Sequence, residues 1–325
     1  MLPIQYIKLE KILGHKVLNE GNEAFETRPK KINIITGCNG SLKTAFLEAL
    51  VTTMEMMTGR GYCVHNLHVL CSFLRGDVAW IYSLASDDLE MVVNGYEVRS
   101  IDADTLAKLG MKMEDMKGFA LLKDKKLLVV NYVTRENFHL KAVSDFVPED
   151  FRYITFYMPQ SMTSKFTSMF TSAIDIMKAM KVVREVLGFE TVYSKVDSLN
   201  RYTFYVVKDG KEVPIERLGR GMMNLVLLAL ASSNDVVIVD NVENSLHPQM
   251  MSKAIDIISK SDSQWFITTY SVDFIAHMLL ERPSDVMLYQ FEKKDYTLTI
   301  RQLDGEQARK VALEEKVDLR GNCYE

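Results

Sequence analysis

The sequence predicts an α/β fold with a mostly parallel core sheet, and two observations support this prediction. Short runs rich in β-branched residues, K-I-N-I-I-T at 31–36 and D-V-V-I-V-D at 235–240, indicate buried strands. Helical patterns follow these runs, and strands that alternate with helices are typical of a parallel sheet. The chain has 325 residues, of which 47% are hydrophobic, so it has enough apolar material to bury a core.

The N-terminal part predicts a strand, a glycine-rich loop and a helix in succession. Residues 4–13 partly alternate apolar and polar residues and predict a first strand, whereas 14–31 is polar and predicts turns. The buried run at 31–36 leads into G-C-N-G-S-L-K-T at 37–44. A helical pattern follows the loop and ends at Gly59.

The middle of the chain predicts an antiparallel lobe. Residues 77–145 contain short apolar runs that are separated by turn sequences, including N-G at 94–95 and K-D-K-K at 123–126. Another strand is predicted at 152–158, and residues 161–187 are mostly helical in pattern.

The last third predicts compact strand and helix units. Asp209 and Gly210 predict a two-residue hairpin turn. The glycine turn at 217–221 opens an apolar helix, and Pro248 suits the first position of another helix. The other predicted elements are a buried strand at 235–240 that ends in a carboxylate, a strand at 264–269 and a helix at 272–280.

Composition and charge argue against several function classes. The net charge is −4 and the pI is about 6.0, so no overall basic field exists to hold nucleic acid. The basic clusters at 28–31 and 123–126 could touch DNA phosphates, but solvated turns are the simpler interpretation. No apolar run approaches the ~20 residues of a membrane helix, and the N-terminus lacks a signal-peptide pattern. Because the four cysteines form no C-x-x-C pair, we expect a cytoplasmic, reduced protein.

The segment 37–44 matches the phosphate-binding pattern G-x-x-x-x-G-K-[ST] except at one position. Gly37, Lys43 and Thr44 fit, whereas Leu42 stands where the second glycine belongs. In such a P-loop, backbone N–H groups and a helix N-terminus face phosphate. If Leu42 has a positive φ, we expect strain of about 1–2 kcal/mol and roughly tenfold weaker nucleotide binding. The alternative is a strand-to-helix turn that binds nothing.

Further motifs follow the P-loop in order along the chain. They are Gln160 after a strand, L-G-R-G at 218–221, V-V-I-V-D at 236–240 followed by N-V-E-N-S-L-H-P, Q-W-F-I-T-T-Y-S at 264–271 and V-D-L-R at 317–320. Together they resemble the Q-loop, signature, Walker B and switch motifs of soluble ABC-type ATPase heads of the AAA-15/AAA-21 group. This group is OLD-like and related to the SMC and recombination-repair ATPases. The likeness covers about 1–50 and 150–325.

This resemblance implies the P-loop NTPase fold of an ABC-type ATPase head. We expect a mostly parallel core sheet, an antiparallel β lobe and a helical signature lobe. The chain, 1–325, would be a single head with four parts: a P-loop half at 1–76, an inserted antiparallel lobe at 77–158, a helical lobe at 159–200, and a half with the signature, Walker B and switch motifs at 201–325.

The resemblance also implies roles in binding ATP and Mg²⁺. Lys43 would grip the β- and γ-phosphates, Thr44 and Asp240 would hold Mg²⁺, and Gln160 would face the γ-phosphate. The other implied nucleotide-binding positions are Gly37, Asn39, Gly40, Ser41 and Leu42 in the P-loop, and Leu218, Gly219, Arg220 and Gly221 in the signature. The signature would contact nucleotide bound by an opposing head, so a homodimer or a heterodimer with another ATPase head is implied.

Three positions depart from what this chemistry needs. Beside Leu42, Asn241 occupies the place of the carboxylate that activates the attacking water, and an amide cannot accept a proton at neutral pH. Tyr270 occupies the place of the switch histidine. Glu243 could serve as a substitute base, although in the motif it belongs to the E-N pair. We therefore predict ATP binding with weak hydrolysis, and the alternative is sequence drift in a working enzyme.

The biological role is suggested only by analogy with the family. Genome maintenance or defence against mobile elements is expected, with a nuclease as one conceivable partner, no membrane, and DNA contact unsupported by the net charge. The alternative is a non-catalytic scaffold or regulatory subunit that pairs with an active ATPase or nuclease. A zinc site at 63–71, where His65, His68 and Cys71 would share a helical stripe, is less favoured than a buried helix face.

Overall fold

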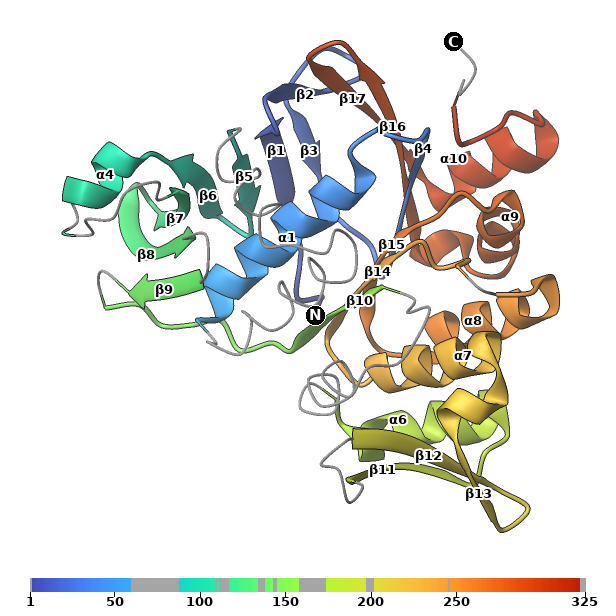
Figure 1. Cartoon of the computed structure of the whole chain (residues 1–325). Coiled ribbons are helices and arrows are strands. Elements are labelled where there is room, and N and C mark those ends of the chain that lie inside the picture. Colours follow the sequence, from blue (N-terminus) through green and yellow to red (C-terminus); the bar gives the residue numbers. More distant parts are fainter. Residues whose placement is uncertain are drawn as a thin grey trace.

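The computed structural model describes residues 2–59, 88–108, 110, 117–133, 138–142, 145–157, 174–196, 202–244 and 246–321. Their strands form one 14-stranded sheet and one three-stranded sheet (Figure 1). Within these ranges, no helix is long and apolar enough to cross a membrane. The candidate zinc cluster at 63–71 lies outside the described residues.

The core of the large sheet is parallel, as predicted. Five neighbouring strands run in the same direction, in the order β10 (Tyr153–Tyr157), β14 (Val236–Asp240), β15 (Gln264–Thr268), β4 (Ile32–Gly37) and β16 (Val286–Lys294). The register pairs Val239 with Ile267 and Thr268 with Ile35. Because the carboxyl ends of parallel strands meet at one edge, the residues that follow β4, β14 and β15 come together there.

Alternate side chains of these strands enter two separate cores. On one face, Ile35, Ile238 and Phe266 pack in the same cluster as the apolar side chains of α1 (Lys43–Thr58). On the other face, Val239 and Ile267 pack with three helices, which Figure 1 shows on the opposite side of the sheet from α1. These helices are α7 (Arg220–Ala231), α8 (Pro248–Lys260) and α9 (Val272–Glu281).

Beyond β16 the large sheet continues mostly with antiparallel pairs, although β17 (Thr297–Asp304) and β2 (His15–Asn19) pair in parallel. From β16 the strand order runs through β17, β2, β1 (Ile7–Ile12), β5 (Glu90–Val93), β6 (Tyr96–Ile101), β7 (Lys117–Lys123), β8 (Lys126–Val133) and β9 (Phe138–Ala142), while β3 (Phe25–Thr27) pairs with β1. A short helix, α4 (Ala103–Lys108), follows β6. The predicted turns are confirmed, since Asn94 and Gly95 have φ of 50° and 83°, and Asp124 and Lys125 have φ of 51° and 64°.

The second sheet lies beside the signature helix α7 (Figure 1). It contains β11 (Thr191–Val196), β12 (Tyr202–Lys208) and β13 (Lys211–Pro214), all antiparallel, and it is preceded by α6 (Ile176–Val182) and η1 (Val183–Leu187). The predicted hairpin is confirmed, because Asp209 and Gly210 have φ of 51° and 68° between β12 and β13. The remaining short helices are η2 (Ile215–Leu218), η3 (Pro283–Asp285), α10 (Gly305–Arg309) and η4 (Lys310–Glu314).

Several strands form where the sequence pattern predicted something else. The polar segment 14–31 contains β2 and β3, which are short and only partly buried. The hairpin of β16 and β17 at 286–304 was not predicted at all. β10 falls within the expected antiparallel lobe at 77–158, yet it pairs in parallel with β14. Likewise, β11 falls within the segment 159–200, where a helical lobe was expected.

Helix α1 carries a carboxyl group into the core. The side chain of Glu55 belongs to a residue that is only 2% exposed, and its Oε2 has no hydrogen-bond partner among the described residues. Burial raises the pKa of Glu55 from 4.5 to about 8, because a charged carboxylate would lose its hydration there. The group is therefore mostly protonated in the folded protein at neutral pH.

We expect Glu55→Gln to stabilise the fold by an amount that grows with pH. Below the unfolded pKa of 4.5 the carboxyl is protonated in both states and costs nothing. As the pH rises toward the folded pKa of about 8, the unfolded state ionises first and the wild type loses stability. The variant should gain at least about 1 kcal/mol at pH 8, or about 2 °C in Tm. Thermal unfolding between pH 5 and 9 measures this gain. An equal gain at all pH values, or the same gain in the exposed control Glu292→Gln, would contradict the assignment.

Candidate functional site

The glycine-rich loop between β4 and α1 is curled tightly. Gly37 has a φ of 142°, and a Cβ atom at this position would lie 2.3 Å from the carbonyl oxygen of Phe291 on the neighbouring strand, so only glycine fits. Gly40 has a φ of 78°. Leu42, at the N-cap of α1, adopts the left-handed conformation with φ 65° and ψ 18°, which confirms the positive φ considered from the sequence.

A leucine in this conformation strains the backbone. Its side chain packs, partly buried, against the core cluster that contains α1, and this packing offsets part of the backbone cost. The strain lowers the stability of the fold. The roughly tenfold weaker nucleotide binding expected from it stays a prediction.

The loop closes around the amine of Lys43. Its Nζ donates hydrogen bonds to the carbonyl oxygens of Gly37 (2.8 Å) and Cys38 (2.7 Å), and to Oγ of Ser41 (3.2 Å). Lys43 is only 4% exposed. Burial lowers the pKa of Lys43 to about 8, against the opposing influence of the Asp240 and Glu243 carboxylates.

A carboxylate and two hydroxyls meet beside the loop. Oγ1 of Thr44, at the start of α1, lies 3.1 Å from Oδ2 of Asp240 at the end of β14. Oγ1 of Thr268, at the end of β15, donates to the other oxygen of Asp240 and accepts a hydrogen bond of 2.7 Å from the backbone N–H of Asn241. Hydroxyl and carboxylate oxygens are the ligands that Mg²⁺ prefers, so Thr44 and Asp240 fit the role that the sequence implied for them.

Glu243 is anchored to the end of β15. Its Oε1 accepts a hydrogen bond of 2.6 Å from the backbone N–H of Tyr270, and its Oε2 accepts one of 2.9 Å from Oγ1 of Thr269. Asn241, two residues earlier, has a φ of 53°, a conformation that asparagine tolerates better than most residues. These contacts give Glu243 a positioning role for the switch segment, whichever residue acts as base.

Tyr270 faces the P-loop lysine. The centroid of its ring lies 4.2 Å from Nζ of Lys43, within the range of a cation–π contact. Burial and the carboxylates of Asp240 and Glu243 raise the pKa of the Tyr270 hydroxyl above its usual 10.0, so the ring is uncharged at neutral pH. Sequence reasoning identified Tyr270 but not this contact with Lys43, nor the part played by Thr268 and Thr269 in the same T-T-Y-S motif.

The signature residues lie at the exposed start of α7. Gly219 is the N-cap, with φ 81° and ψ 154°, and Gly219 and Arg220 are exposed. One turn further, the buried Asn224 donates a 3.3 Å hydrogen bond from Nδ2 to the carbonyl oxygen of Asn244, in the loop after β14. Gln160 lies outside the described residues.

The C-terminal segment touches the P-loop. Sγ of Cys38 lies 3.8 Å from the carbonyl oxygen of Arg320, whose guanidinium pairs with Asp318 at 2.6 Å. Cys38 is disulfide-bonded, so the expectation of fully reduced cysteines is wrong for this structure. The V-D-L-R motif at 317–320 thus lies against the loop that the sequence marked as phosphate-binding.

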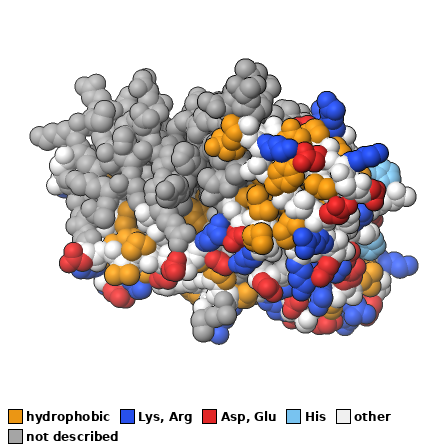
Figure 2. Space-filling view, turned by 90° about the horizontal axis from the view of Figure 1, so that it is seen from below, with side chains coloured by type: hydrophobic (Ala, Val, Ile, Leu, Met, Phe, Trp, Pro, Cys, Tyr) orange, Lys and Arg blue, Asp and Glu red, His pale blue; other side chains and the backbone are white. Residues whose placement is uncertain are grey.

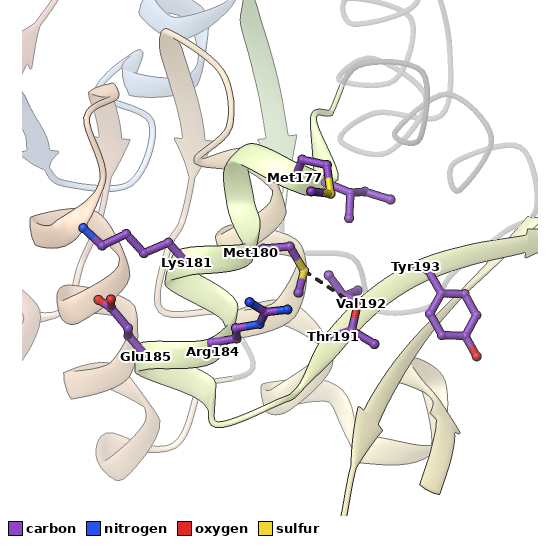
Figure 3. A pocket seen from close by; sticks show the side chains of 9 residues that line it. Met177, Met180, Lys181, Arg184, Glu185, Thr191, Val192 and Tyr193 are labelled. Atoms are coloured by element: carbon purple, nitrogen blue, oxygen red, sulfur yellow. Dashed lines mark hydrogen bonds between the residues drawn. The ribbon is translucent and has the colours of Figure 1, made fainter. Parts of the chain in front are cut away.

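A separate pocket of about 670 Å³ lies between the α6–η1 segment and β11 (Figure 3). Met177, Met180, Arg184 and Thr191 are among its lining residues. It shares none of the site residues that the sequence predicted. The described part of the face seen from below Figure 1 mixes basic, acidic and hydrophobic side chains (Figure 2).

The chain is similar to solved structures of SMC heads, and the first one named here shows the same fold. One similar structure is the Smc head domain with an extended coiled coil, bound to the C-terminal domain of ScpA, from Pyrococcus furiosus; identity is 10%, the TM-score is 0.50, and the match covers 97% of this chain and 99% of that chain. Another is the SMC head domain from Thermotoga maritima, with 10% identity, a TM-score of 0.43, and coverage of 92% and 98%. No curated protein matches the chain significantly.

Residues 99–275 match a family model described as "AAA domain, putative AbiEii toxin, Type IV TA system". This range contains β14, the signature, Asn241, Glu243 and Tyr270, whereas the P-loop precedes it. The match spans more than half of the chain, so this protein belongs to the AAA_21 family of AAA domains and has the fold of an SMC-like, P-loop ATPase head.

Proposed function

We propose that this chain binds ATP with Mg²⁺ at the loop 37–44. The observation that carries the proposal is the cation of Lys43 held inside a curled glycine loop, next to the paired oxygens of Thr44 and Asp240. Strand ends in a parallel sheet and a helix N-terminus surround this point, which is the usual place for a phosphate ligand in an α/β fold.

Each residue would have a distinct part in binding. Lys43 would contact the β- and γ-phosphates, Thr44 and Asp240 would hold Mg²⁺, and Gln160 would approach the γ-phosphate from its own segment. Mg²⁺ would supply neutralisation of the negative charge on the outer phosphates. Gly37 lets the loop lie close to Phe291, and Gly40 adopts a φ of 78°, so both glycines permit the curl of the loop.

We expect MgATP to raise the Tm of the wild type and Lys43→Ala to abolish this shift. A ligand that binds only the folded state adds about 2.7 kcal/mol at a hundredfold excess over Kd. Differential scanning fluorimetry measures the shift in Tm, and calorimetric titration measures the heat of binding. Both are run with and without reductant because Cys38 is disulfide-bonded. The exposed Lys181→Ala is the matched control. If the wild type shows neither a shift nor heat of binding, the scaffold alternative is the better description.

We propose further that hydrolysis is weak, because Asn241 cannot act as a general base. The backbone N–H of Asn241 is fixed by Thr268, next to the carboxylate of Asp240, so its side chain starts close to the implied position of the outer phosphates. Glu243 has both carboxylate oxygens engaged by the switch segment, which supports the assignment of the missing base to position 241.

We expect Asn241→Asp to increase phosphate release several-fold over the wild type. Aspartate has the shape of asparagine and tolerates the same left-handed backbone, so the change introduces a base with little strain. Asn241→Glu should also gain activity, with an added strain of about 1 kcal/mol. A coupled phosphate assay measures the rates. Asn22→Asp, at an exposed asparagine that also has a positive φ, is the control. A wild type that already turns over rapidly, with no gain in either variant, would refute the assignment.

We also propose that two heads associate around nucleotide through the signature residues 218–221, of which Gly219 and Arg220 are exposed. The backbone N–H groups at the start of α7 have no partner within the helix. They could donate hydrogen bonds to a phosphate that is bound by a second head. The partner is a second copy or a related head, and a role in genome maintenance or defence follows only by analogy with the family.

Gly221→Asp should therefore reduce MgATP-dependent dimerisation at least tenfold, because its carboxylate would repel a phosphate at the helix start. Light scattering with and without MgATP measures the mass. Met177→Asp places the same charge at the second residue of α6 and serves as the control. Dimerisation that is equal in both variants would argue for another interface.

A further inference from the structure

The amine of Lys43 has no unused donor in this structure. A lysine ammonium has three N–H groups, and Nζ makes three hydrogen bonds, to the carbonyl oxygens of Gly37 and Cys38 and to Oγ of Ser41. The residue is 4% exposed, so solvent hardly reaches it. A phosphate oxygen could approach Nζ only if a neighbouring group moved away.

The ring of Tyr270 is the neighbour that can move most easily. Its centroid is 4.2 Å from Nζ of Lys43, and the other partners of Nζ belong to the loop itself. Tyr270 is half-buried, whereas Lys43 and Ser41 are buried, so the ring borders on solvent. A rotation about its side-chain bonds would uncover the amine, and a phosphate oxygen could then replace the longest of its three hydrogen bonds, the 3.2 Å contact with Oγ of Ser41.

The backbone of Tyr270, in contrast, is held firmly. Its N–H donates to Oε1 of Glu243 at 2.6 Å, and the preceding Thr269 donates to Oε2 at 2.9 Å. The following residue, Ser271, caps α9 by accepting a hydrogen bond from the N–H of Phe274. The residue is therefore fixed at both ends, and only its side chain can leave Lys43.

We propose that Tyr270 is a ring cap on the P-loop lysine, and that nucleotide binding requires this ring to swing away. The inference rests on the proposed binding of MgATP at the same loop. A cation–π contact with a partly desolvated amine is modest compared with charge-assisted hydrogen bonds to phosphate, so a triphosphate can displace the ring. Only molecules in which Lys43 is uncovered can bind nucleotide. The apparent affinity for nucleotide is therefore the intrinsic affinity multiplied by the fraction of such molecules.

Removing the ring should therefore tighten nucleotide binding. We expect Tyr270→Ala to lower the Kd for MgATP about three- to tenfold, in line with the usual strength of a cation–π contact. Calorimetric titration measures Kd in both proteins. Tyr296→Ala, which removes an 80% exposed tyrosine from the β16–β17 turn, is the control and should not tighten binding. Weaker or unchanged binding in Tyr270→Ala would overturn the proposal and would indicate that the ring contacts the nucleotide or is neutral.

A second measurement tests the cap without nucleotide. Acetylation of lysines by acetic anhydride, followed by mass spectrometry, reports how accessible the Lys43 amine is relative to the exposed Lys181 in the same sample. Tyr270→Ala should react at Lys43 at least threefold faster than the wild type, whereas Tyr270→Phe, which keeps a ring over the amine, should stay protected. Equal rates in all three proteins would refute the cap.

The two measurements separate this inference from the proposed function. If no protein binds MgATP but Lys43 reacts faster in Tyr270→Ala, the cap exists and the nucleotide proposal fails. If MgATP binds and neither Kd nor labelling changes, the nucleotide proposal stands and the cap is wrong.

Discussion

The buried cation of Lys43 is the constraint on which the rest of the site depends. An ammonium that is 4% exposed is costly unless its donors are satisfied, and burial lowers the pKa of Lys43 to about 8 although the carboxylates of Asp240 and Glu243 act in the opposite direction. The loop offsets this cost because two of its carbonyl oxygens point inward and accept hydrogen bonds from Nζ. This arrangement requires the backbone conformations of Gly37 and Gly40. The carboxylates of Asp240 and Glu243 add a favourable field from the neighbouring strand end. The loop geometry thus follows from stabilising one charge, and phosphate would enter a site whose charge is already in place.

The backbone strain at Leu42 bears first on the stability of the fold. A left-handed leucine is strained by about 1–2 kcal/mol, and its side chain packs, partly buried, against the core cluster that contains α1. The three departures from the family motif differ in kind: Leu42 strains the fold, the ring of Tyr270 lies over the amine of Lys43, and Asn241 would act on the proposed chemistry. Only the last of these proposals concerns the loss of a general base.

The local sequence pattern predicted those elements whose turn residues or hydrophobic periodicity lie within a few consecutive residues. The buried strand β4, the glycine loop and α1 were predictable together, and so was the Asp209-Gly210 hairpin, because turn chemistry and periodicity are local. β2 and β3 were missed because they are short and only partly buried, and their pairing with β1 supplies what their sequence lacks. The contact between Lys43 and Tyr270 could not be predicted, since it depends on the register of β15 against β4, which pairs Thr268 with Ile35.

The loop after β14 joins the parts of the site that the sequence treats as separate motifs. Asn241 at its start is tied to β15 through Thr268, and Glu243 holds the backbone of Tyr270. Asn244, at the other side of this loop, accepts a hydrogen bond from Asn224 of α7, the helix whose exposed start carries the signature. The signature helix and the ring over Lys43 are thus linked through one short loop by direct hydrogen bonds. Since α7 would meet a second head at its start, this loop connects that interface by hydrogen bonds with the residue that lies over the P-loop lysine.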